Sequence, residues 1–503
     1  MRHNELTRRR FAQAGAAAAA MAGTAFAKAE LNPAIQKAMK SVQEAIAKAE
    51  SDPDRPRYHF RPPAQWNNDP NGVLFYRGWH HMFYQHNPYD SKWGHMHWGH
   101  ARSRDLVNWE HLPIALWPST EKKEDHVFSG GAAIAADGRP RLFYTSIGPR
   151  NPEQWMAIPA DDDLIVWEKY AGNPILTLAS HGDQKIDSWR DPFLFREGGK
   201  WYMVCGGNLN ARHGGAGSVE LYEATTPDLT GWKYRGVVYE DRDREINNIE
   251  CPNLFKLGSK WVLLFAPHKP CVYMVGSLDL ARGKFIPETR GILDPGTSYA
   301  NNVSFDDKGR CILWLWGPTN TDPDKGWNGA MVMQRILTVG SDGYLRQVPA
   351  PDFESLRGEM KMGRTAELQD QPVVVEGIAG DCVEIQAEFS ADAKTNAMGL
   401  RVRRPAKGGG IEISFAPRSG ILSVDGVLKL IACERQLNLR VFLDERVIEV
   451  YAGGGTAAIY KSISAAPGDL GVEAFAAGGT AQLTSIKAWP MKPAHFSLER
   501  YQV

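Results

Sequence analysis

The sequence predicts an all-β protein, with a five-bladed β-propeller followed by a C-terminal β-sandwich. A hairpin signature recurs five times between residues 69 and 318, which is typical of propeller blades. After about residue 360 the repeat gives way to strands in which apolar and polar residues alternate, as in a sandwich with one wet face per sheet. The 16 Trp, 49 Gly and 31 Pro among 503 residues suit short strands, tight turns and stacking surfaces.

Two segments precede the repeat. Residues 1–27 combine a twin-arginine pattern at Arg8 and Arg9, an Ala-rich apolar run and a small-x-small cleavage site, which predict a bacterial export signal peptide. No later segment has the roughly 18 consecutive apolar residues of a spanning helix, so no membrane span is predicted. Within the extension at 28–56, residues 30–50 have apolar positions at helical spacing and predict one amphipathic helix, either a spacer or a brace docked on the main domain.

Each repeat is an apolar strand, a tight turn that usually contains Gly, and a second apolar or aromatic strand. The starts are Asp69, Ser129, Asp191, Cys251 and Asn301, at spacings of 60, 62, 60 and 50 residues. A second signature runs in phase with the first, as Asp105-Leu106 before Trp109, Asp163-Leu164 before Trp167, Asp228-Leu229 before Trp232 and Asp279-Leu280 before Phe285. Five such units predict blades over residues 57–357, and residues 358–503 then form the linker and the sandwich.

The repeat predicts where the acids meet. The first strand of each blade lines the axis of a propeller, so the hairpin starts crowd around one end of the channel. Asp69, Asp191 and Glu250 are therefore expected to converge from three blades. Taken singly, Asp69 and Asp191 are also ordinary turn residues, but their shared phase favours a site.

Converging carboxylates can perform glycoside hydrolysis, in which one ionised acid attacks and one protonated acid donates to the leaving oxygen, about 5–5.5 Å apart in retaining enzymes. Ile249 and Pro252 suggest an apolar setting that keeps Glu250 protonated. Amide donors around Asp69 and the neighbouring Arg190 are expected to keep Asp69 and Asp191 ionised.

The net charge and the spacing of His and Cys argue against other classes of function and site. With 58 basic and 58 acidic residues, the zero net charge argues against a nucleic-acid or anionic-membrane partner. Six of the 14 His lie between His80 and His100, but their spacing fits no standard metal-ligand set, so structural or sugar-contacting roles are favoured. The six scattered Cys are expected to be buried thiols, with disulfides as the alternative.

The acidic motifs resemble those of glycoside hydrolase family 32, the invertases, levanases and inulinases. The resemblance covers about residues 57–500. It comprises Trp66–Gly72 (WNNDPNG), Gln85–Pro88 (QHNP), Trp93-Gly94, Trp98–His100, Phe128–Gly130 (FSG), Arg190–Pro192 (RDP), Glu250–Pro252 (ECP), Gly326–Gly329 (GWNG) and Phe442–Val450.

The resemblance implies a β-fructofuranosidase without metal or organic cofactor. Asp69 would be the nucleophile, Glu250 the acid/base and Asp191 the stabiliser of the transition state. The fructose subsite would be formed by Asn68, Gln85, Trp93, Phe128, Ser129, Arg190 and Trp327. Sucrose or fructan chain ends are the expected substrates of an exported, periplasmic or extracellular enzyme. The alternatives are an endo-acting levanase or inulinase, and a non-catalytic fructan-binding protein.

The chain departs from the family pattern at Asn67, Gly131 and Glu445-Arg446. Asn67 stands where an aliphatic residue is usual, and it is expected to face solvent or the leaving-group subsite. None of these departures touches an acid, so they bear on the substrate and not on the chemistry.

Overall fold

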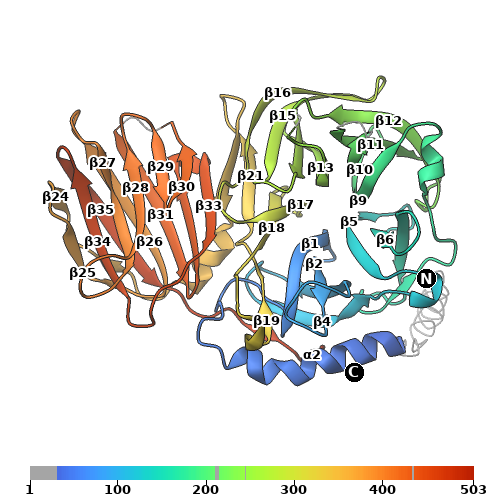
Figure 1. Ribbon diagram of the computed structural model, residues 1–503, viewed down its shortest axis with the longest axis horizontal. Coiled ribbons are helices and arrows are strands. Elements are labelled where there is room, and N and C mark those ends of the chain that lie inside the picture. The colour runs from blue at the N-terminus through green and yellow to red at the C-terminus, as the bar shows by residue number, and fades with distance from the viewer. Residues whose placement is uncertain (1–30, 210–214, 244, 433–434, 503) are drawn as a thin grey trace, which may run out of the picture.

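A computed structural model describes residues 31–209, 215–243, 245–432 and 435–502 (Figure 1). The predicted signal peptide at 1–27 lies outside these residues. The first described element is the helix α2 (Pro33–Glu50), which begins at the N-cap Asn32 and buries Ile35, Met39 and Val42 on one face. No helix among the described residues is long and apolar enough to cross a membrane.

Five sheets form the propeller, each made mainly of consecutive antiparallel strands. The first blade contains β1 (Gln65–Tyr76), β2 (Trp79–Asn87), β3 (His97–Ser103) and β4 (Trp109–Leu116). The second contains β5 (His126–Ile134), β6 (Pro140–Ile147), β7 (Glu153–Pro159) and β8 (Trp167–Lys169), and the third contains β9 (Ile186–Glu197), β10 (Lys200–Leu209), β11 (Ala216–Ala224) and β12 (Trp232–Glu240). The fourth contains β13 (Glu250–Leu257), β14 (Lys260–Ala266), β15 (Val272–Asp279) and β16 (Lys284–Ile292), and the fifth contains β17 (Tyr299–Phe305), β18 (Cys311–Gly317), β20 (Ala330–Met331), β21 (Arg335–Val339) and β22 (Leu345–Pro349). The innermost strands β1, β5, β9, β13 and β17 each lie against the next around the ring. This arrangement confirms the predicted five-bladed propeller.

Two short strands complete the first blade from distant parts of the chain. β19 (Trp327–Asn328) pairs in parallel with the inner strand β1, and β36 (Phe496–Ser497) pairs in parallel with the outer strand β4. Short 3-10 helices lie in the connections, at Thr120–Lys122, Leu178–His181, Pro323–Lys325, Pro351–Leu356 and Gly453–Gly455.

The C-terminal part is a sandwich of two sheets, as predicted (Figure 1). One sheet contains β23 (Lys361–Met362), β24 (Ala366–Leu368), β26 (Cys382–Ala391), β31 (Gln436–Asp444), β32 (Val447–Ala452), β33 (Ala457–Ser462) and β35 (Ala481–Pro490). The other contains β25 (Val373–Ala379), β27 (Ala397–Arg404), β28 (Ile411–Ala416), β29 (Ile421–Val424), β30 (Val427–Leu430) and β34 (Gly471–Ala477). Their facing apolar side chains form a separate core.

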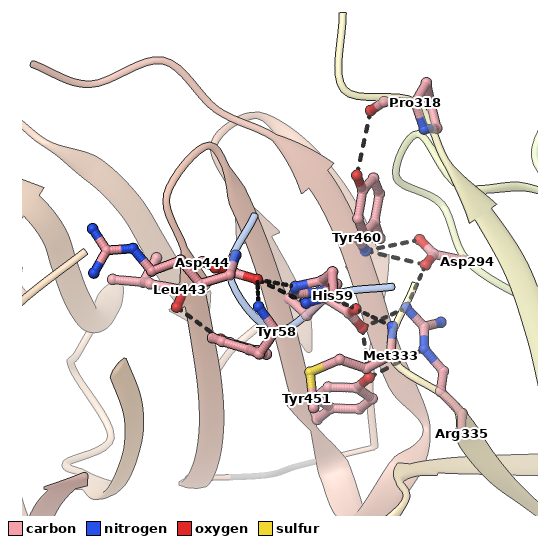
Figure 2. Close-up of polar contacts among 12 residues, drawn as sticks. Tyr58, His59, Asp294, Pro318, Met333, Arg335, Leu443, Asp444, Tyr451 and Tyr460 are labelled. Carbon is pink, nitrogen blue, oxygen red and sulfur yellow. Dashed lines mark hydrogen bonds and ion pairs between the residues drawn. The ribbon is translucent and has the colours of Figure 1, made fainter. Parts of the chain in front are cut away.

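A buried charged network joins the sandwich to the propeller (Figure 2). The His59 ring lies between two carboxylates of the sandwich, with Nδ1 2.8 Å from Asp444 and Nε2 3.0 Å from Glu449. Arg335 of the propeller donates to Glu449 and to Asp294, at 3.1 and 2.9 Å. Burial opposes a charged imidazole, but the two carboxylates outweigh it and raise the pKa of His59 to about 9.

The tryptophans of the blades differ in burial, and the thiol prediction is confirmed for the described cysteines. Trp109, Trp167 and Trp261 are buried in the blades, whereas Trp201 and Trp232 are only partly buried. Five cysteines are buried thiols, namely Cys205, Cys251, Cys271, Cys311 and Cys382, and Cys433 lies outside the described residues.

Candidate active site

A cavity of about 330 Å³ opens at the end of the channel where the inner strands begin. Its lining consists of Trp66, Asn68, Asp69, Gln85, Trp93, Phe128, Ser129, Arg190, Asp191, Glu250, His268, Tyr299 and Trp316. The structure thus brings together the three predicted carboxylates and six of the seven predicted binding residues.

Irregularities in the inner strands aim these side chains. Each of the five inner strands has a shift in its pairing register close to its start. The shifts lie between Asn67 and Pro70, Val127 and Gly130, Arg190 and Phe193, Glu250 and Asn253, and Tyr299 and Asn302. The shift in β9 therefore includes Asp191. A bulge bends its strand and re-aims a side chain, and such bulges occur next to active sites. Asp191 itself has φ +61°, a left-handed conformation that an Asp seldom adopts. The shared position of the bulges explains why one repeat phase supplies one site.

Asp69 is buried in a small hydrogen-bonded chain. Ser129 Oγ donates to Oδ2 at 2.5 Å and Asn68 Nδ2 donates to Oδ1 at 2.9 Å. Trp66 Nε1 in turn donates to Asn68 at 2.7 Å, and Gln85 donates to Ser129 at 3.1 Å. Burial raises the pKa of Asp69, although the two hydrogen bonds oppose this rise. The amide donors expected from the sequence are present, but they do not cancel the effect of burial.

Asp191 is also buried, and its Oδ2 accepts the backbone N–H of Cys251 at 2.9 Å. Cys251 Sγ lies 3.7 Å from both the Asp69 and the Asp191 Oδ2 atoms, so the two carboxylates face the same point. Burial raises the pKa of Asp191 to about 7 despite the opposing charge of Arg190. The expectation that Arg190 keeps Asp191 ionised is therefore wrong for the free protein at acid pH.

Glu250 has a polar setting, contrary to the expectation from its sequence neighbours. Arg190 Nη2 contacts Oε1, Tyr299 Oη donates to Oε2 at 2.7 Å, and His268 Nε2 lies 3.1 Å from Oε1. Ile249 and Pro252, the apolar neighbours of Glu250 in the sequence, are not among the residues that line the cavity around it. Arg190 Nε is also 3.8 Å from Asp191, and the guanidinium therefore lies between two of the acids.

Sequence reasoning missed Tyr299, His268 and Trp316. Tyr299 begins β17 two residues before the repeat start Asn301, so the repeat phase contains the signal for it. His268 lies two residues after the end of β14, the second strand of its blade, and Gln85 lies near the end of β2, the second strand of the first blade; this similar position is a weaker signal. Trp316 is the penultimate residue of β18 and packs on Trp66 with ring centroids 5.6 Å apart.

Two sequence predictions about this region are wrong. Trp327 does not line the cavity, since its side chain is 1% exposed and its Nε1 donates to Asp52 Oδ2 at 2.9 Å. The parallel pairing of β19 with β1 places Trp327 next to Gln65, where it packs under α2. Asn67 faces neither solvent nor a subsite, because it is fully buried against the carbonyl groups of Asn328 and Gly329.

The histidine-rich segment consists mainly of buried, uncharged rings. Burial lowers the pKa of His81 and His97 to about 3 and that of His86 to about 4. In the described part of the chain, none of these rings belongs to a group of three possible metal ligands.

Comparison with known proteins gives one consistent result. The model of the glycosyl hydrolases family 32 N-terminal domain matches residues 59–349, and that of the C-terminal domain matches 352–490. A levanase of Bacillus subtilis is 29% identical over 496 residues, which cover 87% of this chain and 70% of the levanase. A sucrose-6-phosphate hydrolase of Zymomonas mobilis is 30% identical over 488 residues, with 88% and 93% covered. The solved structure of a Bombyx mori β-fructofuranosidase superposes with a TM-score of 0.74 at 29% identity, over 91% of this chain and 98% of that one.

Proposed function

Because this chain belongs to glycoside hydrolase family 32 and is a glycosidase acting on fructosides, we propose that it removes terminal β-D-fructofuranosyl residues from sucrose or fructans with retention of configuration. The observation that carries the proposal is the meeting of Asp69, Asp191 and Glu250, from three blades, in one cavity. Retaining hydrolysis needs a nucleophile and a proton donor on opposite sides of one bond, and these acids supply both.

In this mechanism Asp69 attacks C2 of the fructosyl unit while Glu250 protonates the departing oxygen. Asn68 and Ser129 hold the two oxygens of Asp69, so the attacking carboxylate is oriented before substrate arrives. Asp191 accepts hydrogen bonds from the ring hydroxyls, which strengthen as positive charge develops on the ring. Glu250 then removes a proton from a water molecule as the water oxygen attacks C2, and the bond between C2 and Asp69 breaks, which releases fructose and restores the carboxylate.

The cavity favours unphosphorylated substrates and chain ends. Its size, about 330 Å³, is at the small end of the range for ligand sites, which suits a terminal sugar unit. Arg190 is the only Lys or Arg among the described lining residues, and it already contacts Glu250. A phosphate on the substrate would therefore lack a free cationic partner here.

The direct test is sugar release from sucrose, levan and inulin with product lengths recorded, and with Asp69→Asn as the matched inactive control. We expect free fructose as the first product, and methyl β-fructofuranoside when methanol is added as a competing acceptor. Oligosaccharides as first products would instead indicate endo cleavage. Binding without any release by the wild type would indicate a fructan-binding protein.

The pH dependence of kcat/KM follows from the ionised forms of Asp69 and Asp191, which the mechanism requires for attack on C2 and for stabilising the positive charge. Burial raises the pKa of Asp191 to about 7 and also raises the pKa of Asp69. We therefore expect kcat/KM on sucrose to rise with pH up to about 7, so that its acid limb lies at a higher pH than ordinary aspartates would give. A kcat/KM that is already maximal at about pH 4, near the pKa of an ordinary Asp, would contradict this assignment.

We also propose that residues 1–27 direct export of the folded enzyme. The twin-arginine pair Arg8-Arg9, the apolar run and the cleavage site support it. Replacing Arg8 and Arg9 by Lys is expected to retain fructosidase activity in the cytoplasmic fraction, and unchanged export would refute the proposal.

A further inference from the structure

The segment before the family match, residues 31–58, packs against the first blade of the propeller, where α2 lies against β4 and β1 (Figure 1). The apolar face of α2 packs against Trp327 of β19, together with Tyr501 from the end of the chain. Just after the helix, Asp52 is 6% exposed and aims its carboxylate at the same indole.

Asp52 links this segment to the loop between β18 and β20. Its Oδ2 accepts from Trp327 Nε1 at 2.9 Å, and its Oδ1 accepts from Lys325 Nζ at 3.2 Å. The Arg55 guanidinium lies 5.9 Å over the Trp327 ring and is itself fixed by the carbonyl groups of Pro62 and Pro63 at 2.7 and 2.9 Å. Burying a carboxylate away from water is costly unless donors replace the lost water, so the Asp52 carboxylate is held where Trp327 and Lys325 donate to it.

A continuous set of contacts leads from Trp327 to the candidate nucleophile. Gln65 N–H donates to the Gly326 carbonyl at 2.8 Å, and Trp66 is the β-ladder partner of Asn328. The Trp66 indole then donates to Asn68, whose amide donates to Asp69 at 2.9 Å.

Departures from the family pattern strengthen this set of contacts. The Asn67 amide lies 2.8 Å from the Gly329 carbonyl and 3.3 Å from that of Asn328, so it fastens β19 to β1. Arg446 of the sandwich reaches Thr321 at 3.5 Å in the same loop. An aliphatic residue at position 67 would provide no such hydrogen bonds.

We propose that Asp52 is a positioning residue, which acts through Trp327 and β19 to hold Trp66 and the Asn68–Asp69 pair in the geometry that binds and attacks the fructosyl unit. The inference rests on the proposed function, in which Asp69 is the nucleophile. A small displacement of a reacting group can lower a rate by up to about 10²-fold. Because Trp66 lines the cavity, the effect extends to sugar binding as well as to turnover.

The test compares Asp52→Ala, Asp52→Asn and Trp327→Phe, and the double variant Asp52→Ala/Trp327→Phe. Trp327→Phe keeps an aromatic ring and removes only the donor, and Asn at position 52 can still accept from the indole. We expect Asp52→Ala and Trp327→Phe each to lower kcat/KM on sucrose about tenfold, with a rise in KM. Asp52→Asn is expected to retain most of the activity. Because Asp52 and Trp327 act through one hydrogen bond, the double variant is expected to have a kcat/KM no lower than that of the less active single variant.

The matched control is Gln43→Ala, which removes a different contact of α2, the 3.3 Å hydrogen bond to the Tyr501 carbonyl. It is expected to leave kcat and KM unchanged even if it lowers the unfolding midpoint by as much as Trp327→Phe does. Wild-type kinetics in folded Trp327→Phe, or equal kinetic losses in Gln43→Ala, would overturn the inference. Fructose binding measured by calorimetry gives a second readout, so the inference can fail or hold even if the wild type shows no hydrolysis.

Discussion

Replacing Glu250 by Gln is expected to lower kcat on sucrose about 10²- to 10⁴-fold, the usual contribution of a general acid. The glucosyl leaving group needs a proton as its bond breaks, and a glutamine amide cannot supply one. The side chain keeps its size and can still contact Arg190 and Tyr299, so the fold around the site is preserved. Steady-state kinetics on sucrose measure the effect directly.

The discriminating measurement uses 4-nitrophenyl β-D-fructofuranoside, whose leaving group departs without protonation. We expect Glu250→Gln to retain much more activity on this substrate than on sucrose. Asp69→Asn, the matched carboxylate-to-amide change, is expected to lose both activities because attack on C2 is abolished. Equal losses of both activities in Glu250→Gln would remove Glu250 from the acid role.

Replacing His59 by Leu is expected to lower the free energy of unfolding by about 3–5 kcal/mol, the cost of breaking a buried charge pair. The change leaves the Asp444 and Glu449 carboxylates buried without their shared cation. His495→Ala is the matched control, because that side chain is exposed. Urea unfolding at pH 6 measures the difference, and a loss no larger than in the control would show that the network adds nothing to stability.

The same network predicts how stability changes with pH. The folded pKa of His59 is raised above its ordinary value of 6.5 to about 9, so its contribution is complete below about pH 6.5 and disappears as the pH rises through 9. The pKa values of Asp444 and Glu449 are lowered from their ordinary values despite burial, largely by His59 and, for Glu449, by Arg335. The carboxylate contribution is therefore lost as the pH falls through those ordinary values into the acid range. We expect the wild type to lose stability between pH 6.5 and 9, and the His59→Leu variant to show no such loss.

The repeat made the propeller and the meeting of its acids predictable, because one phase of a fivefold repeat must map to one end of a channel. The surroundings of each acid were less predictable. Arg190 directly precedes Asp191 in the sequence, and its Nε lies 3.8 Å from that carboxylate, but its Nη2 contacts Glu250 of the next blade. The bulge in β9 makes this second contact hard to predict. Trp327 matched a binding motif, yet the pairing of β19 with β1 and the packing of α2 bury it. Such contacts join residues hundreds of positions apart, and no local pattern contains them.

The outer edge of the first blade has a consequence for biosynthesis. β36 pairs with β4, and its Phe496 is the ladder partner of Trp109, so the blade whose strands come first in the chain obtains its last strand from residues that follow the whole sandwich. The order of synthesis is therefore not the order of completion. Until the sandwich has been made, β4 is an open sheet edge, the kind of surface on which other chains pair and aggregate. A nascent chain of this protein thus presents this open edge at Trp109 and Glu110 from the synthesis of β4 until β36 has been made and has paired with it.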